Sequence, residues 1–313
     1  MRFTRLFLLL CLATPLSSFA ESSPSVVLIP GSGSSGAKIH VANLNWGTKL
    51  LGGDRYFGLY LDHFAKRKIP AQVCPKEEDQ DRRTLDERAE DCARVLTFAG
   101  NCTPDSKRSL ILVGHSMGGL VARLLAQDPR VRDCVHSVIT VSTPNRGTPL
   151  ADVAVARSGK PSEPFDLFGK LIEFIRFQPK YLHYLPQLQV DRTTQPADLF
   201  RAQDVSDNPA VQYFSVVNSV SSTFIPPLEL GRKLISDELK KRKLNGTPYG
   251  LSNDGIVPTY SMEHGTIIGT LDVHHWGTAC MDPVRRLPEC KRAKNLLMPF
   301  VEGLHDSIAG RSR

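Results

Sequence analysis

The chain has 313 residues, of which 41% are hydrophobic and 23% charged, and its formal net charge is +7. This length and apolar fraction allow a sizeable buried core, in one large α/β domain or two small ones, and exclude a disordered or fibrous protein. The positive charge is mild and scattered, and the sequence carries no motif typical of nucleic-acid binding.

The first twenty residues have the pattern of a secretory signal peptide. Arg2 and Arg5 form a charged start, residues 6–12 are a short apolar run, and the Ser-Phe-Ala of residues 18–20 is a small-x-small cleavage site. The apolar run is too short to span a bilayer comfortably, which favours cleavage over an uncleaved anchor. We therefore expect a secreted or periplasmic protein whose mature part, residues 21–313, forms one domain.

Downstream, apolar strands alternate with amphipathic helices. The expected strands are residues 25–33, 69–75, 110–113, 135–144 and 211–219, and the expected helices are residues 55–68, 83–100 and 118–126. This order predicts βαβ units and an α/β fold with a mostly parallel sheet.

Two segments depart from the alternation. Between residues 150 and 207 the apolar residues fall on more than one side of any helix, which indicates either extra helices that cover the core or a movable cap over an apolar cleft. Residues 231–243 are rich in Lys and Arg, as in a solvated helix or one that contacts an anionic lipid surface.

The stretch "LILVGHSMGGLVARLLA", residues 110–126, carries the strongest motif. A buried strand leads into Gly-x-Ser-x-Gly and then into a helix, which is the pattern of a nucleophile elbow. Gly114 and Gly118 let neighbouring backbone pass the tight turn, and Ser116 stands where the helix begins. The alternative is a tight turn with a spectator serine.

A serine nucleophile needs a base and an orienting acid, which in this fold class follow in the order Ser, Asp or Glu, His. Asp254, in the polar turn "SNDG" after the last clear strand, is the expected acid. A turn-capping aspartate is the alternative, and the other carboxylates in range have no comparable setting: Asp152, Asp204 and Asp207.

The segment "LDVHHWGTA", residues 271–279, offers the base. His275 is the expected base, because a loop histidine followed by a bulky apolar residue recurs in such enzymes. His274 beside it is the alternative, and His264 is a weaker third candidate. His115, inside the elbow, is expected to be a packing residue.

An oxyanion hole needs two backbone donors. Met117 N–H, directly after the nucleophile, and Ser32 N–H, in the loop "IPGSGSSG", are the expected pair. That loop lacks the dinucleotide-binding context, because no acidic residue ends a following strand, so we expect no cofactor.

Together these blocks resemble the bacterial true lipases, secreted triacylglycerol lipases of the α/β-hydrolase fold. The likeness runs over residues 25–278, and it implies a lid in residues 152–195 and the roles just assigned to Ser116, Asp254, His275, Ser32 and Met117. Two positions depart from the family. Pro30 replaces the usual His of the first loop, and Gly277 stands where an Asp would bind the structural calcium, which makes a bound calcium doubtful.

Cleavage after Ala20 leaves six cysteines, an even number that indicates disulfides in an exported chain. Six cysteines allow fifteen pairings. Cys280 and Cys290 are close in sequence, and Cys102 and Cys134 each precede strands that would be neighbours. Cys74 and Cys92 would form the remaining pair.

The sequence therefore predicts an exported serine esterase or lipase that acts on a lipid or ester substrate. If the cap is interfacial, the protein would act at a lipid–water interface. Two alternatives stay open. One is a hydrolase or acyltransferase for another bond, such as a phospholipid ester or an amide, and the other is a non-catalytic binding protein.

Overall fold

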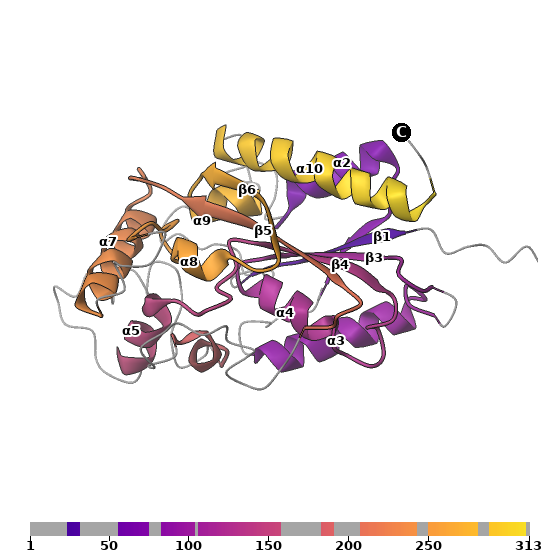
Figure 1. The fold of residues 1–313 in the computed structure, drawn as a ribbon, viewed down its shortest axis with the longest axis horizontal. Helices are drawn as coiled ribbons and strands as arrows, with labels where there is room; N and C mark the ends of the chain where they lie inside the picture. The colour runs from indigo at the N-terminus through magenta and orange to yellow at the C-terminus, as the bar shows by residue number, and fades with distance from the viewer. Residues whose placement is uncertain are drawn as a thin grey trace, which may run out of the picture.

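The computed structural model describes residues 24–31, 56–74, 83–103, 106–157, 183–190, 207–242, 250–280 and 288–310. Its six strands form one parallel sheet in the order β2-β1-β3-β4-β5-β6 (Figure 1). The strands are β1 (Ser25–Ile29), β2 (Ala71–Val73), β3 (Leu110–His115), β4 (Val135–Val141), β5 (Gln212–Ser219) and β6 (Thr266–Asp272). The expected α/β class is confirmed.

The helices lie in layers around this sheet. They are α2 (Gly58–Arg67), α3 (Leu85–Phe98), α4 (Met117–Leu125), α5 (Pro149–Arg157), η3 (Leu185–Leu188), α7 (Pro226–Lys241), α8 (Thr259–Met262), α9 (His275–Ala279) and α10 (Pro288–Ile308). One face of the sheet packs against α3 and α4, and the other packs against α2 and α10 (Figure 1). Helices α5 and α7 contact each other beyond the carboxyl ends of the strands.

Burial on both faces explains the continuous apolar runs that mark the central strands. Val27 of β1 faces the α3–α4 layer, whereas Val26 and Leu28 face the α2–α10 layer, and all three are fully buried. In a parallel sheet covered on both sides, no strand needs the alternation of apolar and polar residues that a half-exposed strand shows.

Strand β6 and helix α10 are the longest elements that were not anticipated from the sequence, and the short helices η3, α8 and α9 were not anticipated either. The strand is an edge strand with mostly half-exposed or exposed residues, and Gly269 interrupts its centre, so it lacks the apolar run of a buried strand. The helix contains Pro299, a residue that usually ends a helical pattern.

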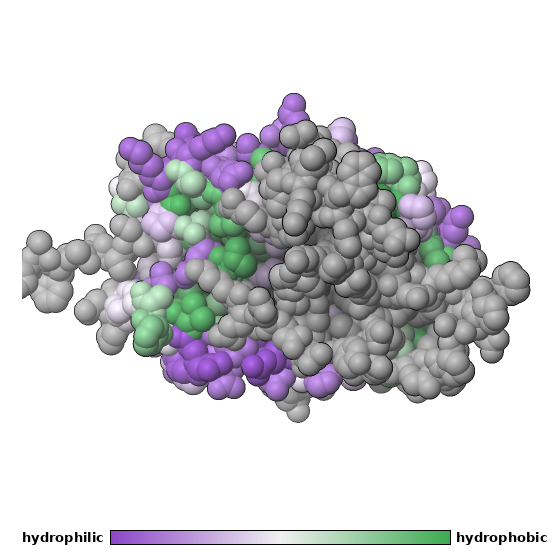
Figure 2. Space-filling model, turned by 180° about the vertical axis from the view of Figure 1, so that it is seen from behind, coloured by the Kyte–Doolittle hydropathy of each residue, from purple (hydrophilic) through white to green (hydrophobic). Residues whose placement is uncertain are grey.

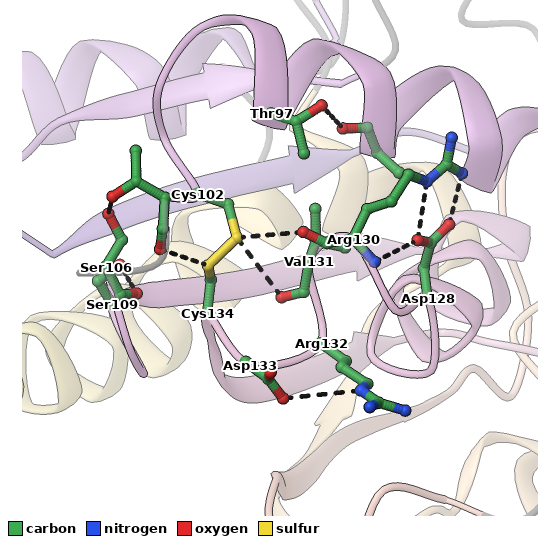
Figure 3. Close-up of a disulfide and its surroundings, with 12 residues drawn as sticks. Thr97, Cys102, Ser106, Ser109, Asp128, Arg130, Val131, Arg132, Asp133 and Cys134 are labelled. Atoms are coloured by element: carbon green, nitrogen blue, oxygen red, sulfur yellow. Dashed lines mark hydrogen bonds and ion pairs between the residues drawn. A yellow bond between two sulfur atoms is a disulfide. The ribbon is translucent and has the colours of Figure 1, made fainter.

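The structure joins the cysteines in the expected pairs. The Cα atoms are 5.4 Å apart in Cys74–Cys92, 5.7 Å apart in Cys102–Cys134 and 5.1 Å apart in Cys280–Cys290. Figure 3 shows the second pair, which closes the loops that lead into β3 and β4. There, Cys102 Sγ lies 3.5 Å from the carbonyl oxygen of Arg130.

In Figure 2, hydrophilic residues lie along the upper and lower margins of the coloured surface, and hydrophobic residues lie between them. Among the described residues, no helix combines the length and the hydropathy needed to cross a bilayer. The expected signal peptide (1–20) and most of the expected cap (150–207) lie outside the described residues, apart from 150–157, 183–190 and Asp207.

Candidate active site

Ser116 occupies a strained turn between β3 and α4. Its φ of 56° and ψ of −134° lie outside the regions that residues with a Cβ prefer, as a nucleophile elbow requires. The turn is held because Ser116 N–H donates to the carbonyl of Val141 on the neighbouring strand, at 2.8 Å. The half-buried serine therefore stands at the carboxyl edge of the sheet.

The glycines on either side of Ser116 allow this geometry. A Cβ on Gly114 would lie 2.4 Å from the carbonyl oxygen of Gly118, and a Cβ on Gly118 would lie 2.1 Å from that of Ile29. Both contacts are with backbone, which cannot move aside. The structure thus gives the steric reason for the glycines of the motif. Met117 begins α4, so its N–H is one of the first-turn donors that lack a helical acceptor.

Asp254 and His275 form a buried pair at the same edge. Asp254 Oδ2 lies 2.7 Å from Nδ1 of His275, while Oδ1 accepts hydrogen bonds from the N–H groups of Ile256 (3.0 Å) and Val257 (2.8 Å). The backbone adds a second link, since His275 N–H donates to the carbonyl of Asp254 at 3.0 Å. A carboxylate only accepts, so Nδ1 carries the proton and the basic lone pair of the neutral ring is on Nε2.

The chain neighbour of Ser116 reaches this pair. The rings of His115 and His275 have centroids 4.8 Å apart, and His115 Nε2 lies 3.0 Å from the carbonyl oxygen of His275. Burial, together with the neighbouring His275, holds the pKa of His115 well below its usual range, so this ring is neutral. His115 thus packs between the elbow and the expected base.

The alternative candidates have other partners. His274 Nδ1 accepts the N–H of Gly277 and so caps α9, and burial lowers the pKa of His274. His264, which precedes β6, pairs at 2.9 Å with Asp207, which precedes β5. Asp152 accepts hydrogen bonds from Arg242 and from the N–H of Val190. Asp204 lies outside the described residues.

The oxyanion loop is described only up to Gly31, so Ser32 lies outside the described residues. Two residues that the sequence did not single out contact Gly31: Tyr56, whose hydroxyl accepts its N–H at 3.2 Å, and Arg88, whose Nη2 lies 3.5 Å from its carbonyl oxygen. Arg88 is fully buried and its Nη1 also lies 3.3 Å from Met117 Sδ. The available sequence signal was an arginine among the apolar-face positions of the helix expected over residues 83–100.

Position 277 has no room for a calcium-binding carboxylate. A Cβ at this position would lie 2.7 Å from both the Glu289 Cβ and the Val273 Cγ1, so no carboxylate could extend from it without displacing them. Among the residues that the structure describes, no group of three or more His, Cys, Asp or Glu side chains could hold a metal ion.

Comparisons with known proteins agree with this architecture. Residues 82–157 match the model of the PGAP1-like alpha/beta domain. The chain is 30% identical over 185 residues to triacylglycerol lipase 2 of Saccharomyces cerevisiae, covering 57% of this chain and 49% of the lipase. It is 33% identical over 72 residues to GPI inositol-deacylase of Debaryomyces hansenii, covering 22% of this chain and 7% of the deacylase. The chain therefore spans half or less of the length of these curated relatives.

Solved structures extend the likeness over nearly the whole chain. The mature lipase of Bacillus licheniformis superposes with a TM-score of 0.57 at 18% identity, covering 93% of this chain and 96% of the lipase. The lipase of Staphylococcus hyicus gives a TM-score of 0.51 at 15% identity, covering 92% and 96%. At these identities the likeness shows the fold, which is that of the α/β-hydrolases.

Proposed function

We propose that this chain is a serine hydrolase that cleaves carboxylic esters of lipids, as a lipase or esterase of the bacterial true lipase type. Ser116 Oγ attacks the ester carbonyl while His275 Nε2 takes its proton, and the same nitrogen returns the proton to the departing alcohol. Water, deprotonated in turn by His275, then cleaves the acyl-enzyme. Asp254 holds the tautomer and stabilises the charged imidazolium.

The negative charge of the tetrahedral intermediate needs fixed donors. The N–H of Met117 and the N–H of Ser32 fill this role in the proposal, and the positive end of α4 adds to the field at the same point. The buried guanidinium of Arg88, between Met117 and Gly31, favours negative charge in their neighbourhood.

One observation carries the proposal: a strained serine at a strand–helix turn shares the sheet edge with a buried aspartate–histidine pair. Backbone strain of this kind is concentrated at functional sites. His115, the chain neighbour of Ser116, also contacts His275. A non-catalytic binding protein needs neither the strain nor the pair.

Hydrolysis of p-nitrophenyl esters from acetate to palmitate tests the proposal, with the wild type compared with Ser116→Ala. We expect Ser116→Ala to lower kcat/KM by at least about a thousandfold at every acyl length and to leave the circular dichroism spectrum unchanged. Retained activity in this variant would refute the proposal, and the preferred acyl length would separate a lipase from an esterase.

A second candidate function is deacylation of a phospholipid or glycolipid. The PGAP1-like match over residues 82–157, which include the elbow, and the likeness to a GPI inositol-deacylase favour it. Fatty acid release from mixed vesicles of phosphatidylcholine, phosphatidylinositol and triolein distinguishes the two. Release from phosphatidylinositol that exceeds release from triolein would favour the second candidate.

Export and the cap remain part of the proposal. Cleavage after Ala20 is expected on expression in a bacterium with its natural leader, and mass spectrometry of the recovered protein would establish the mature N-terminus. If residues 150–207 form an interfacial cap, activity rises abruptly once the substrate exceeds its solubility, whereas smooth saturation would argue against such a cap.

A further inference from the structure

The Tyr56 hydroxyl lies at the meeting point of the oxyanion loop, the elbow and the histidine behind it. It accepts the N–H of Gly31 at 3.2 Å and lies 2.5 Å from His115 Nδ1. The approach is close: a Cβ on Gly31 would lie 2.8 Å from the Ser116 Cβ and 3.0 Å from the Tyr56 hydroxyl. The hydroxyl thus sits beside the proposed nucleophile without being part of the triad.

The direction of each hydrogen bond here follows from the chemistry of its partners. His115 Nε2 faces the carbonyl oxygen of His275 at 3.0 Å, and a carbonyl only accepts, so Nε2 carries the proton of the neutral ring. His115 Nδ1 is then an acceptor, and Tyr56 must donate to it. The hydroxyl of Tyr56 is left with its lone pairs for the N–H of Gly31.

The far end of this chain is also fixed. Thr278 donates its hydroxyl to the His275 carbonyl at 2.9 Å, and its oxygen lies 3.1 Å from His115 Nε2 and 3.0 Å from Ser142 Oγ. Ser142 in turn accepts from the side-chain amide of Asn218. Every donor in this sequence of contacts therefore has an acceptor, from the amide of Asn218 on β5 to the N–H of Gly31 after β1.

We propose that Tyr56 is a positioning residue for the reaction proposed above: through its hydroxyl it fixes Gly31, the residue before the proposed oxyanion donor, relative to His115 and the backbone of His275. The proposal rests on the function proposed above. It assigns Tyr56 no proton transfer and no contact with the substrate. Its effect is on the distance and angle between the oxyanion donors and the base.

Positioning of this kind affects the transition state more than the bound substrate. A displacement of reacting groups by about 1 Å can cost about a hundredfold in rate. We therefore expect Tyr56→Phe to lower kcat by roughly ten- to a hundredfold, with KM changed by less than about threefold. The rate of phosphonylation of Ser116, which builds an oxyanion at the same place, should fall by a similar factor.

Tyr213 offers a matched control. Its hydroxyl also accepts one backbone N–H, that of Asn208 at 3.0 Å, and its ring also lies against a histidine, His264, with centroids 5.2 Å apart. Tyr213→Phe thus removes the same atom from a similar setting on β5, away from the elbow. It should leave kcat, KM and the phosphonylation rate unchanged, even if the melting temperature falls as much as in Tyr56→Phe.

His115→Gln completes the test from the other side of the contact. A glutamine whose amide NH2 replaces the Nε2–H donor holds its acceptor oxygen on the same terminal carbon, away from the Nδ1 position, so Tyr56 loses the acceptor it had there. Tyr56→Phe should therefore reduce kcat less in the His115→Gln background than in the wild type. Should Tyr56→Phe prove too unstable to purify, a kcat loss in His115→Gln with KM unchanged supports the proposal, and wild-type kcat in that variant overturns it.

The outcomes separate this proposal from the one it rests on. If Ser116→Ala is inactive but Tyr56→Phe behaves like Tyr213→Phe, or if the effects of Tyr56→Phe and His115→Gln on kcat simply multiply, the positioning role is wrong and the hydrolase function stands. If Ser116→Ala retains the activity, the proposed function itself fails.

Discussion

Among the described residues, two aspartate–histidine pairs of similar contact distance lie at opposite ends of the strands. At the carboxyl edge, Asp254 and His275 lie 2.7 Å apart, and at the amino edge Asp207 and His264 lie 2.9 Å apart. Asp254 is fully buried and takes its other hydrogen bonds from backbone N–H groups, whereas Asp207 is 30% exposed and also pairs with Arg123.

The difference shows that two pairs with nearly equal contact distances can have different electrostatic surroundings. Asp207 also forms an ion pair with the buried Arg123, whose positive charge offsets part of the electrostatic effect of the carboxylate on His264. Asp254 faces neutral backbone dipoles and directs its second oxygen at one imidazole. Within the part of the chain that the structure describes, the carboxyl edge also has a strained serine, Ser116, at the start of α4. The following substitutions test this contrast.

The largest expected effect separates the two aspartates. Asp254→Asn should lower kcat by about four orders of magnitude, because an amide that donates to Nδ1 stabilises the wrong tautomer of His275. Asp207→Asn should leave kcat within about twofold and reduce the free energy of unfolding by roughly 1–3 kcal/mol, since Arg123 loses its ion pair with Asp207. Steady-state kinetics and urea titration measure both, and a large loss of kcat in Asp207→Asn would erase the contrast.

The Cys102–Cys134 disulfide should matter more for stability, and the Cys280–Cys290 disulfide should matter more for activity. Cys102–Cys134 closes the longer loop, with a separation of 32 residues against 10 for Cys280–Cys290. Chain-entropy arguments give losses of about 4 and about 3 kcal/mol when each pair is replaced by alanine. Below the melting transition, the 102/134 variant should keep its kcat.

The 280/290 variant should lose about tenfold in kcat, because Cys280 follows directly on α9, whose first residue is His275. Guanidinium titrations give the stabilities, and assays at a temperature where both variants are folded give kcat. Equal kcat values in the two variants would show that the position of His275 does not depend on the Cys280–Cys290 link to α10.

The smallest expected effect concerns pH. Burial, together with a neighbouring His275, lowers the pKa of His115, and burial, with Arg108 nearby, lowers that of His136 at the start of β4. Below pH 6.5 the unfolded chain gains protons at these rings before the folded chain does, so the free energy of unfolding falls as the pH falls. The slope per histidine is at most about 1.4 kcal/mol per pH unit.

His136 is only half-buried, so His136→Gln should reduce this acid sensitivity less than His115→Gln does. Urea titrations between pH 7.5 and 5.0 give the slopes of stability against pH. Identical slopes in the wild type and both variants would mean that other groups control the acid limb.

Local pattern predicts the parts of the molecule that depend on near neighbours. The elbow at Ser116 is visible because strand, turn and helix follow one another within a few residues, and the buried runs of β3 and β4 identify the sheet. Strand β6 was not predicted, because an edge strand with Gly269 at its centre has no apolar run. The contact of Tyr56 with His115 joins residues 59 apart, and no local pattern encodes it.

The choice of base shows the same limit. The pattern favours His275 and leaves the adjacent His274 as an alternative. The fold then shows that His275, not His274, contacts the carboxylate of Asp254. The order of Ser, Asp and His along the chain narrows the candidates. It does not orient their rings.

The left-handed turn at Ser116 has an evolutionary consequence. A conformation of this kind costs about 1–3 kcal/mol for a residue with a side chain, and glycine would adopt it freely. Selection for a sturdier protein alone would thus favour Gly at this position over Ser. A hydroxyl at this position fits the hydrolase proposed above, in which the elbow retains its chemistry at a cost in conformational stability.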